Sequence, residues 1–355
     1  MDTKKERGQM LDLLLRPAFC VKDGIITQVS RGAEEMLLAS GMEVAPMLST
    51  GAEEYAAFSG GCLYLDLKLG GRELMASVTR LEDEDVFLLE AEEDVQALNA
   101  LALAARELRE PLSSMTAISE NLLSPYLKED PRSKELLARM SRSLHRMQRV
   151  LGNMADAGVH SPAAQLQLRN IPRVFDAIFS RADKLLAYAG AQLHYEGLGE
   201  DLIGLFDEDL MERAVLNLLS NALRFLPETG GILAAKLSRR GDMLVLTVQD
   251  NGSGIPDAIL GNLFQQYLRT PALEDRRRGL GLGLVIVRQA AASHGGTVLV
   301  DKGEISGTRV TLTMKVRQPS ETTIRSAHVA LTGGRDPGLI ELADILPVSV
   351  YEQEL

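Results

Sequence analysis

The stretch NLLSNALRF, residues 217–225, decides the interpretation of the second half of this chain. On a helix, Asn217 and Asn221 lie one turn apart on the same face, and Arg224 follows beside them. An asparagine oxygen is a suitable ligand for Mg²⁺, which in proteins also keeps phosphate oxygens and water. By itself, such a pair is more often an ordinary part of a helix surface. The segments that follow it therefore decide its meaning.

Two glycine-rich segments follow along the chain. DNGSGIP, residues 250–256, comes directly after an apolar strand expected over 244–248, and GLGLGL, residues 279–284, leads into an apolar helix expected over 285–292. A buried aspartate such as Asp250 can accept the exocyclic amino group of adenine, which discriminates against guanine. Glycines let the backbone approach a base, and ahead of a helix they present free N–H groups to phosphates. The glycines concerned are Gly252, Gly254, Gly279, Gly281 and Gly283.

The glycine run alone would suggest a dinucleotide-binding fold. However, GLGLGL lacks the G-x-G-x-x-G spacing, and the polar stretch 270–278 leads into it where such a fold needs a strand. Phe264 and Arg269 precede that stretch, and Thr308 lies in a later strand pair. Four motifs in this order, spread over about 90 residues, resemble the N box, first glycine box, F box and second glycine box of the histidine-kinase ATPase domain. The resemblance implies helices layered on a mixed β-sheet over residues 165–317.

The same resemblance implies ATP and Mg²⁺ as cofactors. Asn221 would hold the metal ion, Asp250 the adenine and Arg224 a phosphate. Asn217 stands where hydrolytic relatives of this fold carry a glutamate base, so fast ATP hydrolysis is not expected. The further nucleotide-binding residues implied are Asn217, Gly252, Gly254, Phe264, Arg269, Gly279, Gly281, Gly283 and Thr308.

Upstream, the apolar residues recur in alternating steps of three and four, which is the heptad pattern of packed helices. The pattern breaks at Ser124-Pro125 and then resumes, so two helices joined by residues 124–132 are expected. One hairpin buries its seam poorly alone, and a second copy would complete a four-helix bundle. We therefore predict a homodimer through residues 95–158. The seam residues are Leu101, Ala105, Leu108, Leu112, Met115 and Leu122, then Leu137, Met140, Leu144, Met147, Leu151 and Met154.

The histidine-kinase resemblance extends into the first of these helices. The family carries its phosphoacceptor there in a His-Glu-Leu-Arg-Thr-Pro-Leu pattern, and this chain has RELREPL at residues 106–112. Arg106 replaces the histidine beside Glu107, and Glu110 replaces the threonine that the family uses in dephosphorylating its partner. A neutral imidazole offers a lone pair to the γ-phosphorus, whereas a guanidinium offers none. Autophosphorylation at this position is not expected, and His145 is a weaker alternative acceptor.

The N-terminal residues 1–94 are predicted to form a small α/β unit. A hairpin is expected over 19–30, a short helix over 33–39, and a second hairpin over 63–81 that turns at Gly70-Gly71. This order of hairpin, short helices and hairpin resembles a PAS sensor domain. The sequence names no ligand for it.

Two segments allow more than one interpretation. The basic stripe formed by Arg139, Arg142, Arg146 and Arg149 is either a solvated helix face or a docking surface for an acidic partner. The tail, residues 318–355, contains an apolar helix candidate over 339–346. We expect the tail either to cap the ATPase domain or to contact a partner.

Composition narrows the class of protein. A net charge of −11 argues against a nucleic-acid partner, because phosphate backbones are bound by clustered Lys and Arg. Cys20 and Cys62 have neither a disulfide framework nor CxxC spacing, which fits buried thiols in a reducing compartment. No stretch reaches the ~18 apolar residues that span a bilayer, and the N-terminus lacks the apolar run of a signal peptide. We therefore expect a cytoplasmic protein without a transmembrane segment.

Together these features predict a multidomain α+β protein: a PAS-like sensor over 1–94, a dimerisation hairpin over 95–158, an α/β-sandwich ATPase domain over 165–317 and a tail over 318–355. The favoured function is that of an ATP-binding, kinase-like regulator of the sensor histidine kinase family, working in a two-component phosphorelay with a response regulator or a partner histidine kinase. Arg106 would clamp the γ-phosphate bidentately. The alternatives are an active kinase that phosphorylates a partner His or Ser/Thr in trans, and a non-enzymatic interaction module with a vestigial ATP site.

Overall fold

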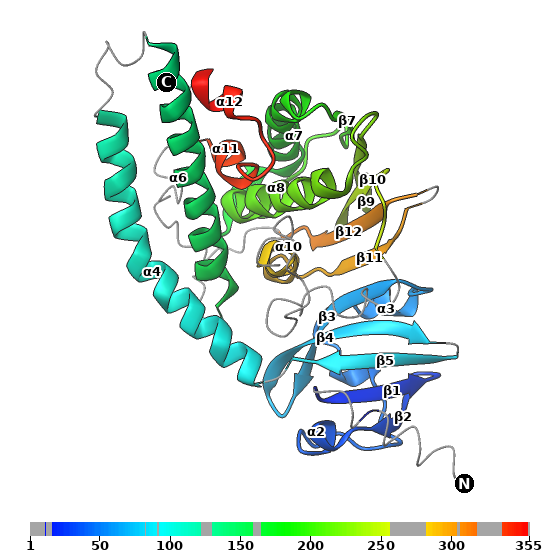
Figure 1. The fold of residues 1–355 in the computed structure, drawn as a ribbon. Coiled ribbons are helices and arrows are strands. Elements are labelled where there is room, and N and C mark those ends of the chain that lie inside the picture. The colour runs from blue at the N-terminus through cyan, green and yellow to red at the C-terminus, as the bar shows by residue number, and fades with distance from the viewer. Residues whose placement is uncertain are drawn as a thin grey trace.

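The computed structural model describes residues 11, 16–81, 83–90, 92–121, 130–158, 165–255, 282–303, 306–317 and 336–353. Figure 1 shows a sheet at the N-terminal end, two long helices along one side, and a unit of helices on a sheet that contacts both. The fold is the mixed α+β class expected from the sequence. The predicted site residues Phe264, Arg269, Gly279 and Gly281, and the seam residue Leu122, lie outside the described residues.

The N-terminal unit is an antiparallel sheet with strand order β2-β1-β5-β4-β3 and short helices between its second and third strands. Both expected hairpins are present, one turning at Asp23-Gly24 and one at Gly70-Gly71, where the glycines have positive φ. The helix expected over 33–39 begins and ends earlier, because Ser30 caps it and the backbone of Leu37 has a left-handed φ of 66°. The elements are β1 (Ala18–Lys22), β2 (Ile25–Val29), α2 (Arg31–Glu34), η1 (Ala45–Met47), α3 (Ala52–Ala56), β3 (Cys62–Leu69), β4 (Arg72–Leu81) and β5 (Glu84–Leu89).

The expected helical hairpin is formed by α4 (Glu92–Asn121) and α6 (Pro131–Ala157), which pack along each other. Asp130 caps α6 by accepting a hydrogen bond from the Ser133 N–H at 2.9 Å, and proline is tolerated in the first turn. The predicted seam divides into two rows. Ala105, Leu112 and Leu144 are buried, whereas other seam residues are exposed. The exposed ones are Leu108, Met115, Met140 and Met147.

The C-terminal half has the expected layers of helices on a mixed sheet. Strand β7 runs parallel to β9, and the other pairs are antiparallel in the order β11-β12-β10-β9-β7, with β6 and β8 forming a separate pair. Helices α7, α8 and α10 pack on one face of this sheet over a shared apolar core. The elements are β6 (Gln167–Asn170), α7 (Ile171–Tyr188), β7 (Gln192–Glu196), β8 (Ile203–Phe206), α8 (Glu208–Phe225), β9 (Ile232–Arg240), β10 (Met243–Asp250), α10 (Leu282–Ser293), β11 (Val298–Lys302) and β12 (Thr308–Lys315).

The two sheets are continuous, which the sequence did not indicate. Strand β3 pairs antiparallel with β11 from Cys62 to Tyr64, so that ten strands form one sheet. Gly61 permits this approach: its φ is +84°, and a Cβ there would lie 2.5 Å from the carbonyl oxygen of Val300. An ion pair of 3.0 Å between Arg288 and Asp66 also crosses the junction. The N-terminal unit is therefore physically coupled to the ATPase-type half.

The C-terminal tail forms two short helices, α11 (Pro337–Glu341) and α12 (Val348–Gln353), that lie between α6 and α7–α8 (Figure 1). The single helix expected over 339–346 is instead α11, which ends at Glu341, followed by turns. Apolar tail residues join the core of the ATPase-type half. The tail therefore caps that half, which was the first of the two expectations for it.

Candidate nucleotide site

Helix α8 positions the asparagine–arginine motif. Asp207 caps the helix by accepting from the Leu210 N–H at 3.0 Å, and Glu208 and Asp209 in the first turn complement the helix dipole. Asn217 is fully buried, whereas Asn221 and Arg224, one and two turns further on, remain partly exposed. The helix therefore presents Asn221 and Arg224 at its accessible end.

The loop after β10 holds Asp250 in a fixed orientation. Its Oδ1 accepts hydrogen bonds from the backbone N–H groups of Gly252 at 2.8 Å and Thr308 at 3.2 Å. In the described part of the chain, no hydrogen bond reaches Oδ2, which leaves that oxygen for a donor on a ligand. Burial raises the pKa of Asp250, although the two N–H bonds oppose this. The contribution of Thr308 is thus its backbone N–H.

The same loop lies against the end of α8, which brings the first two motifs together. The Ser253 N–H donates to the carbonyl oxygen of Phe225 at 3.2 Å, and a Cβ at Gly252 would lie 2.4 Å from that oxygen. A Cβ at Gly307 would lie 2.0 Å from the Asp250 carbonyl oxygen. Only glycine fits at these two positions, whatever ligand binds. Gly254 has a φ of +72° in the same loop.

The glycine run contributes differently from what its sequence suggested. Helix α10 already includes Leu282, ahead of the start expected at residue 285, so Gly283 lies within the helix. A Cβ at Gly283 would lie 2.6 Å from Oδ1 of Asn217. Close packing of α10 on α8 therefore explains this glycine.

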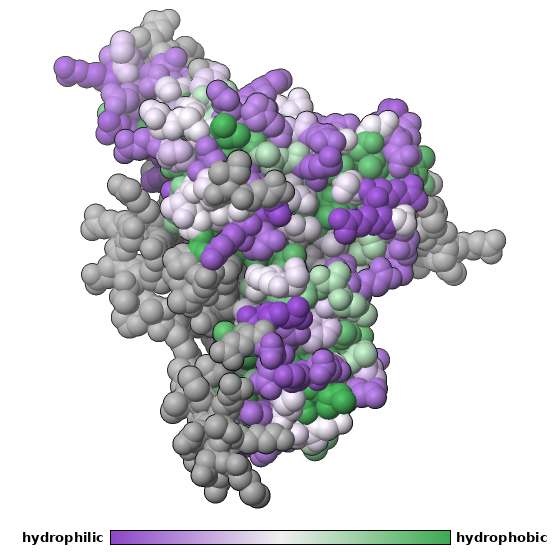
Figure 2. Space-filling view, turned by 90° about the vertical axis from the view of Figure 1, so that its right-hand side faces the viewer, coloured by the Kyte–Doolittle hydropathy of each residue, from purple (hydrophilic) through white to green (hydrophobic). Residues whose placement is uncertain are grey.

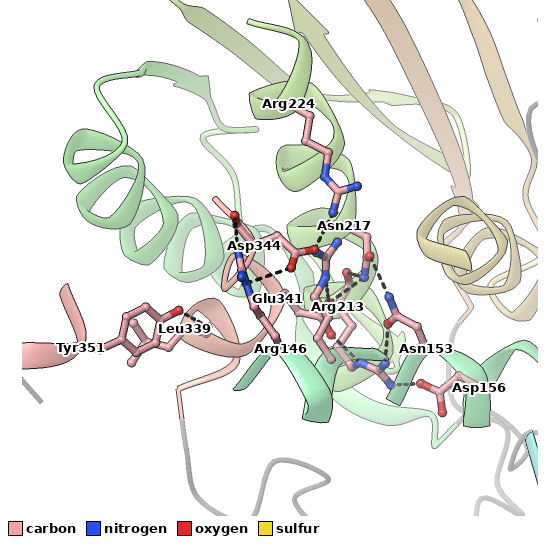
Figure 3. A network of polar contacts seen from close by, with 11 residues as sticks. Arg146, Asn153, Asp156, Arg213, Asn217, Arg224, Leu339, Glu341, Asp344 and Tyr351 are labelled. Atoms are coloured by element: carbon pink, nitrogen blue, oxygen red, sulfur yellow. Dashed lines mark hydrogen bonds and ion pairs between the residues drawn. The ribbon is translucent and has the colours of Figure 1, made fainter. Parts of the chain in front are cut away.

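Two carboxylates from the tail reach the same helix, as Figure 3 shows. Asn217 Nδ2 donates to the Arg213 carbonyl oxygen at 2.9 Å and to Oε2 of Glu341 at 3.1 Å. Arg224 Nη2 donates to Oδ2 of Asp344 at 2.6 Å. Sequence analysis did not identify Glu341 or Asp344 as site residues. The only signal for them was that these two acidic residues interrupt the apolar segment 339–346.

The basic stripe on α6 binds this acidic segment. Arg149 pairs with Oδ2 of Asp344 at 2.5 Å and with Oε2 of Glu341 at 3.4 Å, and Arg146 pairs with Oδ1 of Asp344 at 3.2 Å. Arg142 donates to the carbonyl oxygens of Ala343 and Asp344 at 3.0 and 3.2 Å. The stripe is therefore a docking surface for an acidic segment of the same chain. Its fourth member, Arg139, instead pairs with Glu135 on its own helix.

The positions of the histidine-kinase acceptor motif lie on α4. Arg106 and Glu107 are on its exposed face. The pKa of Arg109 is lowered, first by loss of solvent and then by the positive charges of Arg213 and Arg106. Arg109 therefore lies within electrostatic reach of Arg213 on α8.

The alternative acceptor His145 and a second histidine, His294, are both buried. His145 is buried, its Nδ1 lies 2.8 Å from the Ser141 carbonyl oxygen, and its ring packs against Tyr351. His294 is buried between the Ala290 carbonyl oxygen and the Asp207 N–H. Burial lowers the pKa of His294, so it is neutral and structural.

The residues fit Mg-ATP at the adenine end. Oδ2 of Asp250, which accepts from no described residue, lies beside a glycine-lined loop and is an acceptor that matches the amino group of adenine. No group of three or more His, Cys, Asp or Glu side chains in the described residues could hold a metal ion. In proteins Mg²⁺ usually keeps phosphate oxygens and water, and an asparagine oxygen such as that of Asn221 is a suitable further ligand. At the phosphate end, Arg224 is already paired with Asp344.

A groove of about 1230 Å³ lies elsewhere, lined by α3 and by strands of the ATPase-type sheet, and none of the predicted nucleotide residues that the structure describes lines it. Figure 2 views the side on which β9 to β12 lie in Figure 1, and it shows hydrophilic and hydrophobic residues interspersed. An open, mixed surface of this kind lacks the convergent groups of the Asp250 loop, so we place the site at that loop.

The ATPase-type half is similar to known proteins. Residues 206–318 match the family described as histidine kinase-, DNA gyrase B- and HSP90-like ATPase. The sensor protein ChvG of Agrobacterium fabrum is 30% identical over 251 residues, covering 64% of this chain and 40% of ChvG. The adaptive-response sensory kinase SasA of Gloeothece citriformis is 30% identical over 244 residues, covering 64% of this chain and 61% of SasA. The chain thus spans less than two thirds of either relative.

Solved structures include full-length ShkA in complex with AMPPNP, which is 19% identical with a TM-score of 0.48 and covers 62% of this chain and 46% of ShkA. Histidine kinase ThkA in complex with the response regulator protein TrrA is 16% identical with a TM-score of 0.41 and covers 85% of this chain and 96% of the matched chain. Residues 206–318 therefore belong to the histidine-kinase-type ATPase family, and the two relatives above are a sensor protein and a sensory kinase. Within the described residues, no helix is long and apolar enough to cross a membrane.

Proposed function

We propose that this chain is an ATP-binding regulator of two-component signalling with a working nucleotide site and no phosphoacceptor at the usual position. The orientation of Asp250 carries the first half of the proposal: two N–H groups fix its Oδ1, and its Oδ2 accepts no hydrogen bond from the described residues. Arg106 carries the second half, because a guanidinium has no lone pair for the γ-phosphorus. Asn221 would hold Mg²⁺, and Arg224 would bind a phosphate.

The remaining parts of the proposal concern signal and partners. The hairpin, short helices and hairpin of the N-terminal unit support a PAS-like sensor over 1–94, and its pairing with β11 gives it a route to the ATPase domain. We assign the helical hairpin to 95–158 and the ATPase domain to 165–317. The chain would act on a response regulator or on a partner histidine kinase. A kinase acting in trans on another protein remains the second candidate, because the nucleotide-binding features do not depend on Arg106.

Binding of Mg-ATP is tested by thermal unfolding. We expect saturating Mg-ATP to raise the Tm, since a ligand at 100 times its Kd stabilises the native state by about 2.7 kcal/mol. Asn221→Ala should lose most of this shift. Absence of a shift in the wild-type chain would favour the interaction module with a vestigial site. Acid-labile label from γ-labelled ATP on this chain alone would contradict the interpretation of Arg106, and label on an added partner would favour the trans kinase.

Dimerisation through the hairpin is a separate prediction. Leu108 and Met115 on α4 are seven residues apart, as are Met140 and Met147 on α6, and all four are exposed apolar seam positions. Such rows are what a second copy would cover in a four-helix bundle. We expect Met115→Glu combined with Met147→Glu to weaken the dimer at least about tenfold, since each charge would enter an apolar interface.

Light scattering coupled to size-exclusion chromatography measures the change. The control is Ser113→Glu, which adds a charge on the face of α4 that carries Arg106, seven residues earlier, and should leave the mass unchanged. A wild-type chain that is monomeric at tens of micromolar, or a double variant with the wild-type mass, would contradict the dimer.

A further inference from the structure

The C-terminal segment, residues 336–353, is held in place mainly by apolar packing. Leu339, Leu342, Leu346 and Tyr351 are almost completely buried in the core of the ATPase-type half. The Tyr351 hydroxyl donates to the Leu339 carbonyl oxygen at 2.8 Å and ties the two short helices together. This anchoring does not involve Asp344, which lies between α11 and α12 and retains 33% side-chain exposure.

The two carboxylates of the segment differ in what they do. Glu341, with 3% side-chain exposure, is enclosed by Arg213, Arg149 and Asn217. Asp344 lies nearer the surface and pairs with Arg149, Arg146 and Arg224, the last of which projects from the accessible end of α8 (Figure 3). Glu341 is therefore part of a buried network, whereas Asp344 binds Arg224, the side chain that we propose binds a phosphate.

Among the described residues, the positive charges at this junction outnumber the negative charges. The carboxylates are Glu341, Asp344 and Asp156, which pairs with Arg213. The arginines that bond to them are Arg146, Arg149, Arg213 and Arg224, and Arg142 adds a fifth guanidinium on the backbone carbonyls of the segment. Burial and the neighbouring Arg149 lower the pKa of Arg224, and Asp344 opposes this. The junction is thus suited to accept a further anion.

We propose that Asp344 competes with the phosphates of the nucleotide for Arg224, so that the C-terminal segment is an autoinhibitory latch which ATP loosens. The proposal rests on the ATP binding proposed above. Carboxylate and phosphate oxygens both bind a guanidinium through charge-assisted hydrogen bonds, so one Arg224 side chain serves one of them fully at a time. Phosphate oxygens near Arg224 would also repel the Asp344 carboxylate.

The latch connects the nucleotide to the helical hairpin. Asp344 shares its oxygens between Arg224 on α8 and Arg146 and Arg149 on α6. When Arg224 turns to a phosphate, the bridge from α8 through Asp344 to α6 is broken. Coupling of this kind is reciprocal, so a partner that draws α6 away from the segment would raise the affinity for ATP by the same factor.

Asp344→Asn tests the competition, because it keeps the size of the side chain and removes its charge. We expect the full-length variant to bind Mg-ATP roughly five- to tenfold more tightly than wild type in isothermal titration, and to bind adenosine equally well. The control is Glu352→Gln on α12, which removes the same charge from the same segment outside the arginine cluster, and it should change neither affinity. Equal ATP affinity of wild type and Asp344→Asn would overturn the latch alone. Absence of ATP binding in both would overturn the proposed function and the latch with it.

Hydrogen exchange on the wild-type chain gives a readout that needs no variant. Saturating Mg-ATP should accelerate amide exchange in residues 342–348 at least about twofold, whereas adenosine, which has no phosphates, should not. Unchanged or slower exchange with bound ATP would overturn the latch.

Discussion

Replacing Glu341 with alanine is expected to lower the free energy of unfolding by about 3–5 kcal/mol, a large part of the stability of a typical domain. Glu341 has 3% side-chain exposure and accepts from Arg213 at 3.2 Å and from the Asn217 amide at 3.1 Å. Arg149, with 7% side-chain exposure, lies 3.4 Å away. Without the carboxylate, two buried guanidinium groups and a buried amide would each lose one of their partners.

Urea unfolding followed by circular dichroism measures this difference. Glu196→Ala is a matched control, because Glu196 also pairs with a cation, Lys236 at 2.7 Å, but both side chains are more than half exposed. The loss in the control should stay below about 1 kcal/mol. If Glu341→Ala were no more destabilising than Glu196→Ala, the buried network would not hold the tail on the ATPase domain.

The pieces of the nucleotide site were predictable because each is local in sequence. The spacing of Asn217, Asn221 and Arg224 depends only on helical periodicity, and Asp250 follows a strand whose apolar pattern is visible by itself. The relative placement of the Asp250 loop and the end of α8 followed from the family resemblance. Glycine packing at Gly283 was not predictable, because it depends on how α10 meets Asn217.

The contacts of the tail could not be predicted, since they join residues far apart in sequence. Glu341 is 124 positions from Asn217, and Asp344 is 195 positions from Arg149. No motif links such residues, and a basic stripe such as Arg142 to Arg149 fits a solvated face equally well. The pairing of β3 with β11 could not be predicted either. The sequence of an edge strand does not specify which strand will pair with it.

The heptad pattern identified two helices but not which apolar row faces which neighbour. Leu144 is buried, while Met140 and Met147 on the same predicted seam are exposed. Apolar residues spaced by three and four form a stripe wide enough to contact two neighbouring elements. Only the structure shows that the other hairpin helix and the tail cover one side of this stripe. The other side remains for the predicted second copy.

Asp250→Asn is expected to weaken ATP binding at least about 100-fold, the largest effect on ligand binding that we predict. The amide oxygen would keep the two hydrogen bonds from Gly252 and Thr308, so the loop should retain its shape. Its amide nitrogen would then stand in place of Oδ2 and meet the adenine amino group donor against donor.

Stability should respond differently from binding. Burial raises the pKa of Asp250 above its ordinary value of 3.8, so the ionised form is disfavoured in the folded state at neutral pH. The free energy of unfolding of the wild type therefore rises as pH falls through that raised pKa, and this contribution is absent in Asp250→Asn. At pH 7 the variant should be at least as stable as wild type while it has lost ATP binding.

Isothermal titration with ATP and urea unfolding at pH 7 separate the two effects. Asp242→Asn makes the same chemical change at an exposed aspartate in the turn between β9 and β10, paired with Lys315 at 3.4 Å, and should alter neither measurement. Wild-type ATP affinity in Asp250→Asn would remove adenine recognition from this loop. Loss of both binding and stability would instead mean that the charged carboxylate holds the loop together, because its N–H bonds would then outweigh the cost of burial.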